Sequence, residues 1–265
     1  MSPDFLPLTT VNYELIDAPA TSTSKSTSKV MPIIIWAHGW GQDLSSLKSI
    51  AEGLNAPLQQ FLIDLPGFGQ TPTPNTSYTT RDYAQHIADW LAPLGNRPII
   101  WIGHSFGCRV GLQFAKLFPK KIVHLCCIAG AGLQRTRTPW QKFKLQSRIY
   151  TYKALKKITP LGPMRTQLDQ FFGSRDFQAA GVLRNIFVTT VNEDLTSVAQ
   201  QVLCPTTLIY GELDTETPPE FGSRYARLIP QSTVYILPDQ DHYSLIGNGQ
   251  HQVIRLIYKQ INYLF

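Results

Sequence analysis

The feature of this sequence best suited to chemistry is a serine between two glycines. Residues 101–109 read WIGHSFGCR, with Ser105 flanked by Gly103 and Gly107 directly after an apolar run. A serine hydroxyl becomes a strong nucleophile when a neighbouring base takes its proton. If the glycines permit a sharp turn that projects Ser105 into a cleft, the chain should also supply a histidine and an acid that reach it.

His242 is the best candidate for the base among the six histidines. It follows the last predicted strand, in LPDQDHYSL, at the edge of the sheet from which a base could reach Ser105. The other histidines have less suitable places: His38 follows an early strand, His104 adjoins Ser105, His86 and His251 fall within predicted helices, and His124 lies inside a predicted strand.

Asp214 is the candidate for the acid that orients His242. It stands in GELD, directly after the predicted strand TTLIYG, whereas the loop after the strand CCIAGAG contains no carboxylate. We expect other roles for the neighbouring carboxylates: Glu212 and Glu216 as solvated turn residues, and Asp239 and Asp241 as residues too close in sequence to His242 to orient it easily.

Alternating strands and helices must bring these residues together. Apolar segments end in glycine-containing or proline-containing loops, as in VMPIIIWAHGW and QQFLIDLPGFG, and helical segments come between them. This alternation predicts an α/β fold, with a mostly parallel sheet covered by helices on both faces. In such a sheet, ligands bind outside the carboxyl ends of the strands.

A long segment without this alternation follows Gly132. Up to Thr196 the sequence reads as helices and loops, and the strand and helix pattern resumes at PTTLIYGELDT. We therefore expect an α/β core of residues 1–132 and 197–265. Residues 133–196 are predicted to form a helical lid, or cap, inserted after the sixth strand.

The motif G-x-S-x-G, with the candidates in the order Ser105, Asp214, His242, resembles the α/β-hydrolase family. The segments HGWG, DLPGFG and GELD add to the resemblance, which spans nearly the whole chain except the lid. It implies an α/β-hydrolase fold in which Ser105 attacks a carbonyl carbon, His242 takes its proton, and Asp214 fixes the imidazole. An acyl-enzyme would form and then be hydrolysed.

The resemblance also implies an oxyanion hole. Its donors would be the backbone N–H groups of Trp40 and Phe106. The second loop, with Asp64 and Pro66, is expected to be structural. The chain lacks the lysine and spacing of a phosphate loop, and no histidine, cysteine or carboxylate cluster has metal-ligand spacing. We therefore expect neither a cofactor nor a metal.

The substrate has more than one interpretation. A small-molecule carboxylic ester is the default, but WAHGWGQ followed by DLPGFG resembles the pimeloyl-acyl-carrier-protein methyl ester esterases. That family docks an acidic carrier protein through basic lid residues. Here the segment 133–168 contains no acid, and nine of the 24 basic residues of the chain lie in it: Arg135, Arg137, Lys142, Lys144, Arg148, Lys153, Lys156, Lys157 and Arg165.

Other reactions use the same three residues. Carbon–carbon hydrolases, acyl transferases and the pyruvate-eliminating lyase of menaquinone synthesis share the serine triad, and the lyase also has an arginine placed as Arg109 is here. We interpret Arg109 first as a helix-surface residue. A receptor or scaffold that keeps the fold without the chemistry is a further alternative, and a fluorophosphonate probe would label Ser105 in an enzyme but not in a scaffold.

Composition favours a cytoplasmic enzyme. The four cysteines show neither metal-binding spacing nor a secreted disulfide pattern, and no segment has the length of a membrane span or the form of a signal peptide. The net charge of +6 comes from the basic segment, and no nucleic-acid-binding motif accompanies it. We therefore expect no nucleic-acid or membrane partner.

Overall fold

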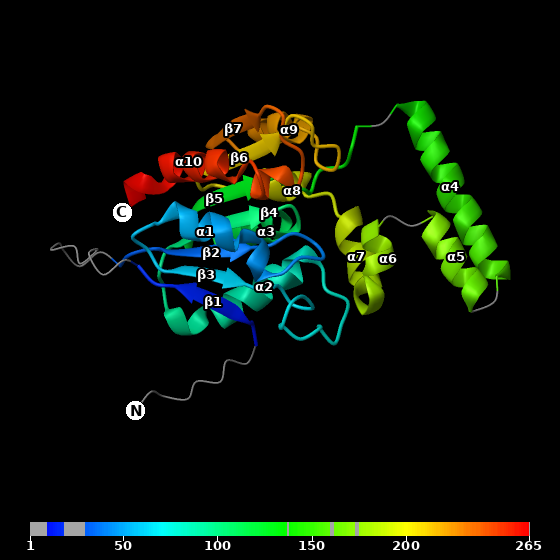
Figure 1. Cartoon of the computed structure of the whole chain (residues 1–265), viewed down its shortest axis with the longest axis horizontal. Helices are drawn as coiled ribbons and strands as arrows, with labels where there is room; N and C mark the ends of the chain where they lie inside the picture. The colour runs from blue at the N-terminus through cyan, green and yellow to red at the C-terminus, as the bar shows by residue number, and fades with distance from the viewer. Residues whose placement is uncertain (1–9, 19–29, 137, 160–161, 173–174, 265) are drawn as a thin grey trace. The chain divides into compact units, whose positions relative to one another are not determined.

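The computed structural model describes residues 10–18, 30–136, 138–159, 162–172 and 175–264, which form two compact units (Figure 1). The first unit comprises Met1–Leu133 and Glu193–Phe265, and the second comprises Gln134–Asn192. Ser105, Asp214 and His242 all belong to the first unit.

The described part of the first unit contains a sheet in the order β1-β3-β2-β4-β5-β6-β7. β1 runs antiparallel to β3, and the other neighbouring strands are parallel. Its strands are β1 (Tyr13–Ile16), β2 (Ile33–Ala37), β3 (Gln60–Ile63), β4 (Ile99–His104), β5 (Ile122–Ile128), β6 (Thr206–Gly211) and β7 (Ser232–Leu237). The predicted α/β-hydrolase fold with a mostly parallel sheet is confirmed.

The central strands are buried along their whole length. β2, β4 and β6 are covered on both faces, which explains why the sequences IIIWA, IIWIGH and TTLIYG are mostly apolar and do not alternate. An amphipathic strand would alternate apolar and polar residues instead. Burial on both faces therefore leaves the carboxyl ends of these strands as the place for polar chemistry.

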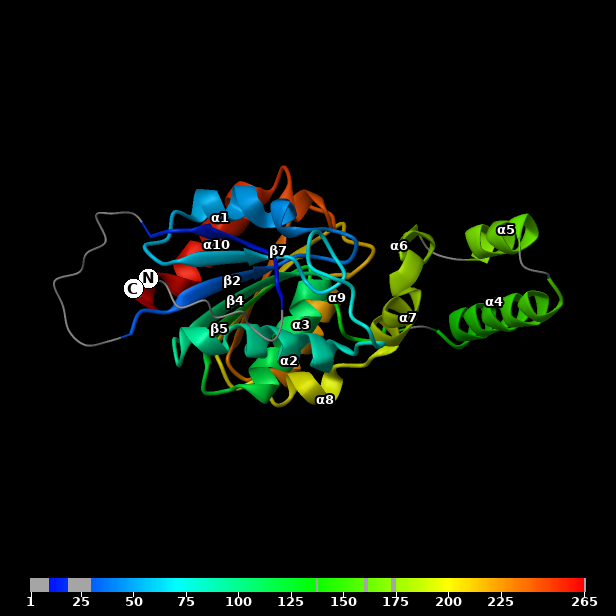
Figure 2. The same cartoon turned by 90° about the horizontal axis from the view of Figure 1, so that it is seen from below.

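Helices cover the two faces of the sheet (Figure 2). α1 and α10 pack together on one face, while α2, α3, α8 and α9 lie on the other. The helices are α1 (Lys48–Leu54), α2 (Thr80–Trp90), α3 (Phe106–Leu117), α8 (Thr196–Ala199), α9 (Glu220–Leu228) and α10 (Gln250–Ile261). The 3-10 turns of this unit are η2 (Leu44–Leu47), η3 (Ala92–Leu94), η5 (Ser244–Ile246) and η6 (Asn262–Leu264).

The second unit is helical in its described residues. It contains α4 (Pro139–Ile158), α5 (Pro163–Phe172), α6 (Arg175–Ala179), η4 (Gly181–Leu183) and α7 (Arg184–Asn192). The chain leaves the first unit near Gly132 and returns near Leu195, whose N–H donates to the Gly132 carbonyl oxygen at 2.8 Å. This hydrogen bond closes the base of the insertion.

The position of the insertion in the chain differs from the expected one. The sequence predicts the insertion after the sixth strand, but in the described chain it follows β5, the fifth strand. The described residues between β1 and β2 form no strand, so the described chain has one strand fewer before the insertion than predicted. Asp214 and His242 still follow the sixth and seventh strands, β6 and β7.

Candidate active site

Ser105 lies at a sharp turn between β4 and α3. Its backbone has φ 47° and ψ −100°, an unusual conformation for a residue with a side chain, and its N–H donates to the Ile128 carbonyl oxygen at 2.9 Å. A Cβ on Gly107 would collide with the carbonyl of Ala37, and one on Gly103 would collide with the backbone of Gly107. The two glycines therefore let β4, α3 and β2 approach closely enough to form this turn.

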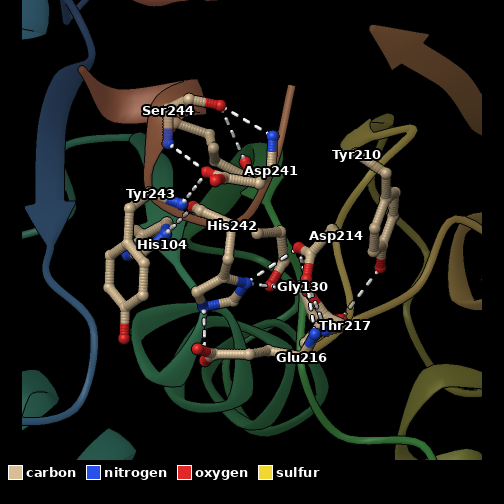
Figure 3. Close-up of polar contacts among 12 residues, drawn as sticks. His104, Gly130, Tyr210, Asp214, Glu216, Thr217, Asp241, His242, Tyr243 and Ser244 are labelled. Carbon is tan, nitrogen blue, oxygen red and sulfur yellow. Dashed lines mark hydrogen bonds and ion pairs between the residues drawn. The ribbon is translucent and has the colours of Figure 1, made fainter. Parts of the chain in front are cut away.

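His242 and Asp214 form a buried pair in the loops after β7 and β6 (Figure 3). Nδ1 of His242 donates to Oδ2 of Asp214 at 2.8 Å, and the two residues are 4% and 3% exposed. Because Nδ1 carries the proton, Nε2 of the neutral ring is the unprotonated nitrogen. This arrangement prepares Nε2 to accept a proton.

The carboxylate of Asp214 is surrounded by hydrogen-bond donors. Oδ1 accepts from the backbone N–H groups of Glu216 and Thr217, both at 2.8 Å, and Oδ2 lies 2.8 Å from the Thr217 hydroxyl. Burial raises the pKa of Asp214, but the hydrogen bond and charge of His242 and the bonds from Thr217 lower it below its ordinary value. The acid therefore remains ionised beside the imidazole at neutral pH.

His104, the residue before Ser105, contacts the loop that carries His242. Its Nε2–H donates to the His242 carbonyl oxygen at 3.1 Å, and the two rings lie 5.0 Å apart between centroids. Burial lowers the pKa of His104 to about 3, so this ring is neutral at pH 7. His104 thus joins the end of β4, where Ser105 begins its turn, to the His242 loop.

Trp40 and Phe106, the predicted oxyanion-hole residues, lie together. Their ring centroids are 5.2 Å apart in an edge-to-face contact, and Trp40 makes a similar contact with Phe68 at 4.9 Å. Trp40 belongs to the loop after β2, and Phe106 is the first residue of α3. These ring contacts bring the loop after β2 next to the Ser105 turn.

The loops after β2 and β3 are held by polar side chains. Asp64 accepts from the backbone N–H groups of Leu44 and Gln70 at 2.8 and 2.9 Å, and from Nδ2 of Asn12 at 2.7 Å. His38, which is fully buried, accepts from the Leu65 N–H at 3.0 Å through Nε2. Both residues have structural partners, in keeping with the roles expected for Asp64 and against His38 as a base.

Arg109 is not a surface residue, and the expectation that it is one is wrong. It is 8% exposed, and its Nη1 donates to the Glu193 carbonyl oxygen at 3.2 Å. α3 lies between α2 and α8, so nearly all of its side chains are covered. Arg109 therefore contacts the chain where it returns from the insertion.

Glu216 and Thr217, which follow Asp214 in the same loop, make contacts with His242 that the sequence did not reveal. Glu216, expected to be a solvated turn residue, is half exposed, but its Oε2 lies 3.6 Å from Nε2 of His242. Thr217 is buried, and its hydroxyl lies 3.2 Å from Nδ1 of His242 as well as close to Asp214. A polar residue three positions after the acid is the signal that could have drawn attention to Thr217.

Among the described residues, no group of three or more histidine, cysteine, aspartate or glutamate side chains could hold a metal ion. In the same part of the chain, every helix is too short or too polar to cross a membrane. The four cysteines are buried free thiols.

Comparison with known proteins identifies the family. The model of the alpha/beta hydrolase family matches residues 34–256, so the chain belongs to the α/β-hydrolase family. The chain is 24% identical over 239 residues to the pimeloyl-[acyl-carrier protein] methyl ester esterase of Chromobacterium violaceum, covering 83% of this chain and 90% of that protein. These matches support a hydrolase.

Solved structures show the same fold. An esterase from Exiguobacterium antarcticum has a TM-score of 0.70 at 16% identity, covering 97% of this chain and 96% of that one. A thermophilic esterase from Thermogutta terrifontis has a TM-score of 0.65 at 19% identity, covering 96% and 93%. At these identities the likeness concerns the fold.

Proposed function

We propose that this protein is a serine hydrolase that cleaves a carboxylic ester. The buried hydrogen bond between His242 and Asp214 carries the proposal, because it leaves Nε2 of the imidazole ready to act as a base. The contact of His104 with the His242 loop supports Ser105 as the nucleophile, since His104 directly precedes Ser105. The esterases among the relatives support an ester as the substrate.

The proposed reaction has two halves. Nε2 of His242 takes the Ser105 hydroxyl proton as Oγ attacks the ester carbon, and Asp214 stabilises the imidazolium. The N–H groups of Trp40 and Phe106 bind the developing oxyanion. The imidazolium then protonates the departing alcohol, leaving an acyl group on Oγ. Water, activated by the same imidazole, releases the carboxylic acid and restores the serine.

Substrate selection is assigned to the insertion, residues 133–196, acting as a cap. The core supplies the reacting groups, whereas a helical insertion can differ in sequence without altering the sheet.

We place the reaction in the cytoplasm, a reducing compartment, because the four cysteines are free thiols.

Hydrolysis of p-nitrophenyl esters of increasing acyl length tests the proposal. The wild-type protein should be active, and Ser105→Ala should lower kcat by about 10⁴-fold or more because it removes the nucleophile. Labelling by a fluorophosphonate probe should occur in the wild type and be absent from Ser105→Ala. A wild-type protein that neither hydrolyses the series nor takes the label would overturn the assignment.

A carrier-protein methyl ester is the second candidate substrate. α4 exposes the cations Lys144, Lys153 and Lys157, and the described part of this helix contains no acidic residue. An acidic carrier protein would complement this charge. Cleavage of an acyl-carrier methyl ester should therefore weaken steeply as salt is raised, while p-nitrophenyl ester cleavage changes little. An equal, flat response of both substrates would exclude docking through α4.

A further inference from the structure

Thr217 lies at the centre of the polar contacts around the acid (Figure 3). Its hydroxyl oxygen is 2.8 Å from Oδ2 of Asp214, 3.1 Å from the Ala129 carbonyl oxygen and 3.2 Å from Nδ1 of His242. Its backbone N–H donates to the other carboxylate oxygen of Asp214 at 2.8 Å. The residue is 4% exposed, so water cannot readily replace its hydroxyl in these contacts.

The hydroxyl has one proton and more than one possible acceptor. The carboxylate is the closer acceptor and carries a charge, and charge-assisted hydrogen bonds are the stronger ones. A hydroxyl that donates to Oδ2 also presents a lone pair to the Nδ1–H of His242. Thr217 can therefore share the imidazole proton with Asp214 while keeping the carboxylate in place.

The contact with Ala129 joins this loop to the neighbouring strand. Ala129 follows β5 and has φ 50°, and its N–H donates to the Ile209 carbonyl oxygen in β6 at 2.8 Å. When the Thr217 hydroxyl turns toward Ala129, it links the acid-bearing loop to the end of β5. A valine at position 217 would have the same shape but no hydroxyl.

We propose that Thr217 is a positioning residue, whose side-chain hydroxyl holds the Asp214 carboxylate and the His242 imidazole in the orientation that lets them hydrogen-bond. This role rests on the proposed function in so far as it concerns turnover. The contacts of Thr217 with Asp214 and His242 stand without any substrate, which allows a separate test.

The test compares Thr217→Val, which removes the hydroxyl at constant shape, with Thr217→Ser, which keeps it. We expect Thr217→Val to lower kcat by about ten- to hundredfold, the range for loss of one hydrogen bond to a charged group, with KM changed less than about twofold. Thr217→Ser should retain most of the wild-type kcat. Equal loss in both variants, or no loss in Thr217→Val, would overturn the proposal.

The pH profile separates positioning from packing. Among the described residues, the groups facing the imidazole are Asp214 and Glu216 after β6, His104 at the end of β4, and Tyr243 in its own loop. Asp241, in the same loop, accepts instead from the backbone N–H groups of Tyr243 and Ser244. Without the Thr217 hydroxyl, the Asp214 carboxylate accepts one hydrogen bond fewer. Its negative charge then attracts the protonated imidazole of His242 more strongly. The acid limb of kcat/KM should therefore move to higher pH in Thr217→Val and stay in place in Thr217→Ser.

Proton NMR of the His242 Nδ1–H resonance makes the test independent of any substrate. The resonance should move downfield in Thr217→Val and keep its wild-type position in Thr217→Ser. An unchanged resonance in Thr217→Val would overturn the proposal even in an active enzyme. If the wild type cleaves no ester but the resonance moves as expected, the proposed function fails and the role of Thr217 stands.

Discussion

The loop that carries Asp214 and the helix α4 show opposite ways of using charge. In the loop, one carboxylate is buried and accepts hydrogen bonds from His242, from Thr217 and from the Glu216 backbone. In α4, basic side chains and large apolar ones are exposed, with Trp140 71% and Tyr150 79% exposed. The loop buries one charge among hydrogen-bond donors, whereas α4 keeps its described basic side chains exposed.

The difference teaches where each property of the enzyme resides. A buried charge requires nearby donors, so the Asp214 loop tolerates little change. An exposed charge has few such requirements, so α4 can change its residues at small cost to stability. Substitutions in the two regions should therefore affect different kinetic parameters.

The largest expected effect follows from neutralising the acid. Asp214→Asn should lower kcat by about 10⁴-fold, because an amide can donate to Nδ1 and favour the imidazole tautomer that has its proton on Nε2. KM should change far less. Steady-state kinetics on a p-nitrophenyl ester measures this, with thermal unfolding to show that the variant is folded. A kcat within tenfold of the wild type would contradict the role of Asp214.

An intermediate effect is expected from reversing charge on α4. Lys153→Glu combined with Lys157→Glu should raise KM for an acyl-carrier methyl ester about tenfold at low salt, since two favourable charge contacts become repulsive. The p-nitrophenyl ester should be cleaved as before. A matched control reverses Lys120 and Lys121, which lie between α3 and β5. Equal changes in both double variants would indicate a general effect of net charge.

The smallest effect concerns Glu216. Its carboxylate, 3.6 Å from Nε2 of His242, can attract the imidazolium formed during the reaction but not the neutral ring. Glu216→Gln should therefore lower kcat/KM by about two- to fivefold at low salt, the range for an exposed ion pair, and by less at about 1 M salt.

Glu212 provides the control for this prediction. It is exposed in the same loop, and its carboxylate accepts from the Asp239 N–H at 3.4 Å. Glu212→Gln should leave kcat/KM unchanged at both salt concentrations. If Glu216→Gln behaves as Glu212→Gln does, the short distance from Glu216 to the imidazole has no kinetic consequence.

Much of the fold could be predicted because its signals are local. Continuous apolar runs such as IIIWA identify strands buried on both faces, and the glycines around Ser105 identify a tight turn. Arg109 could not be placed in this way. Its burial depends on α2 and α8, which come from distant parts of the chain and cover α3.

The sequence by itself determined the parallel sheet, the turn at Ser105 and the choice of Asp214 and His242 as candidates, because spacing and periodicity depend on neighbouring residues. Only the tertiary structure decided which atoms meet. The hydrogen bond from His242 to Asp214 spans 28 positions, and the contact from His104 to His242 spans 138. Thr217 and Glu216 acquire their contacts with His242 because separate strands end at the same edge of the sheet.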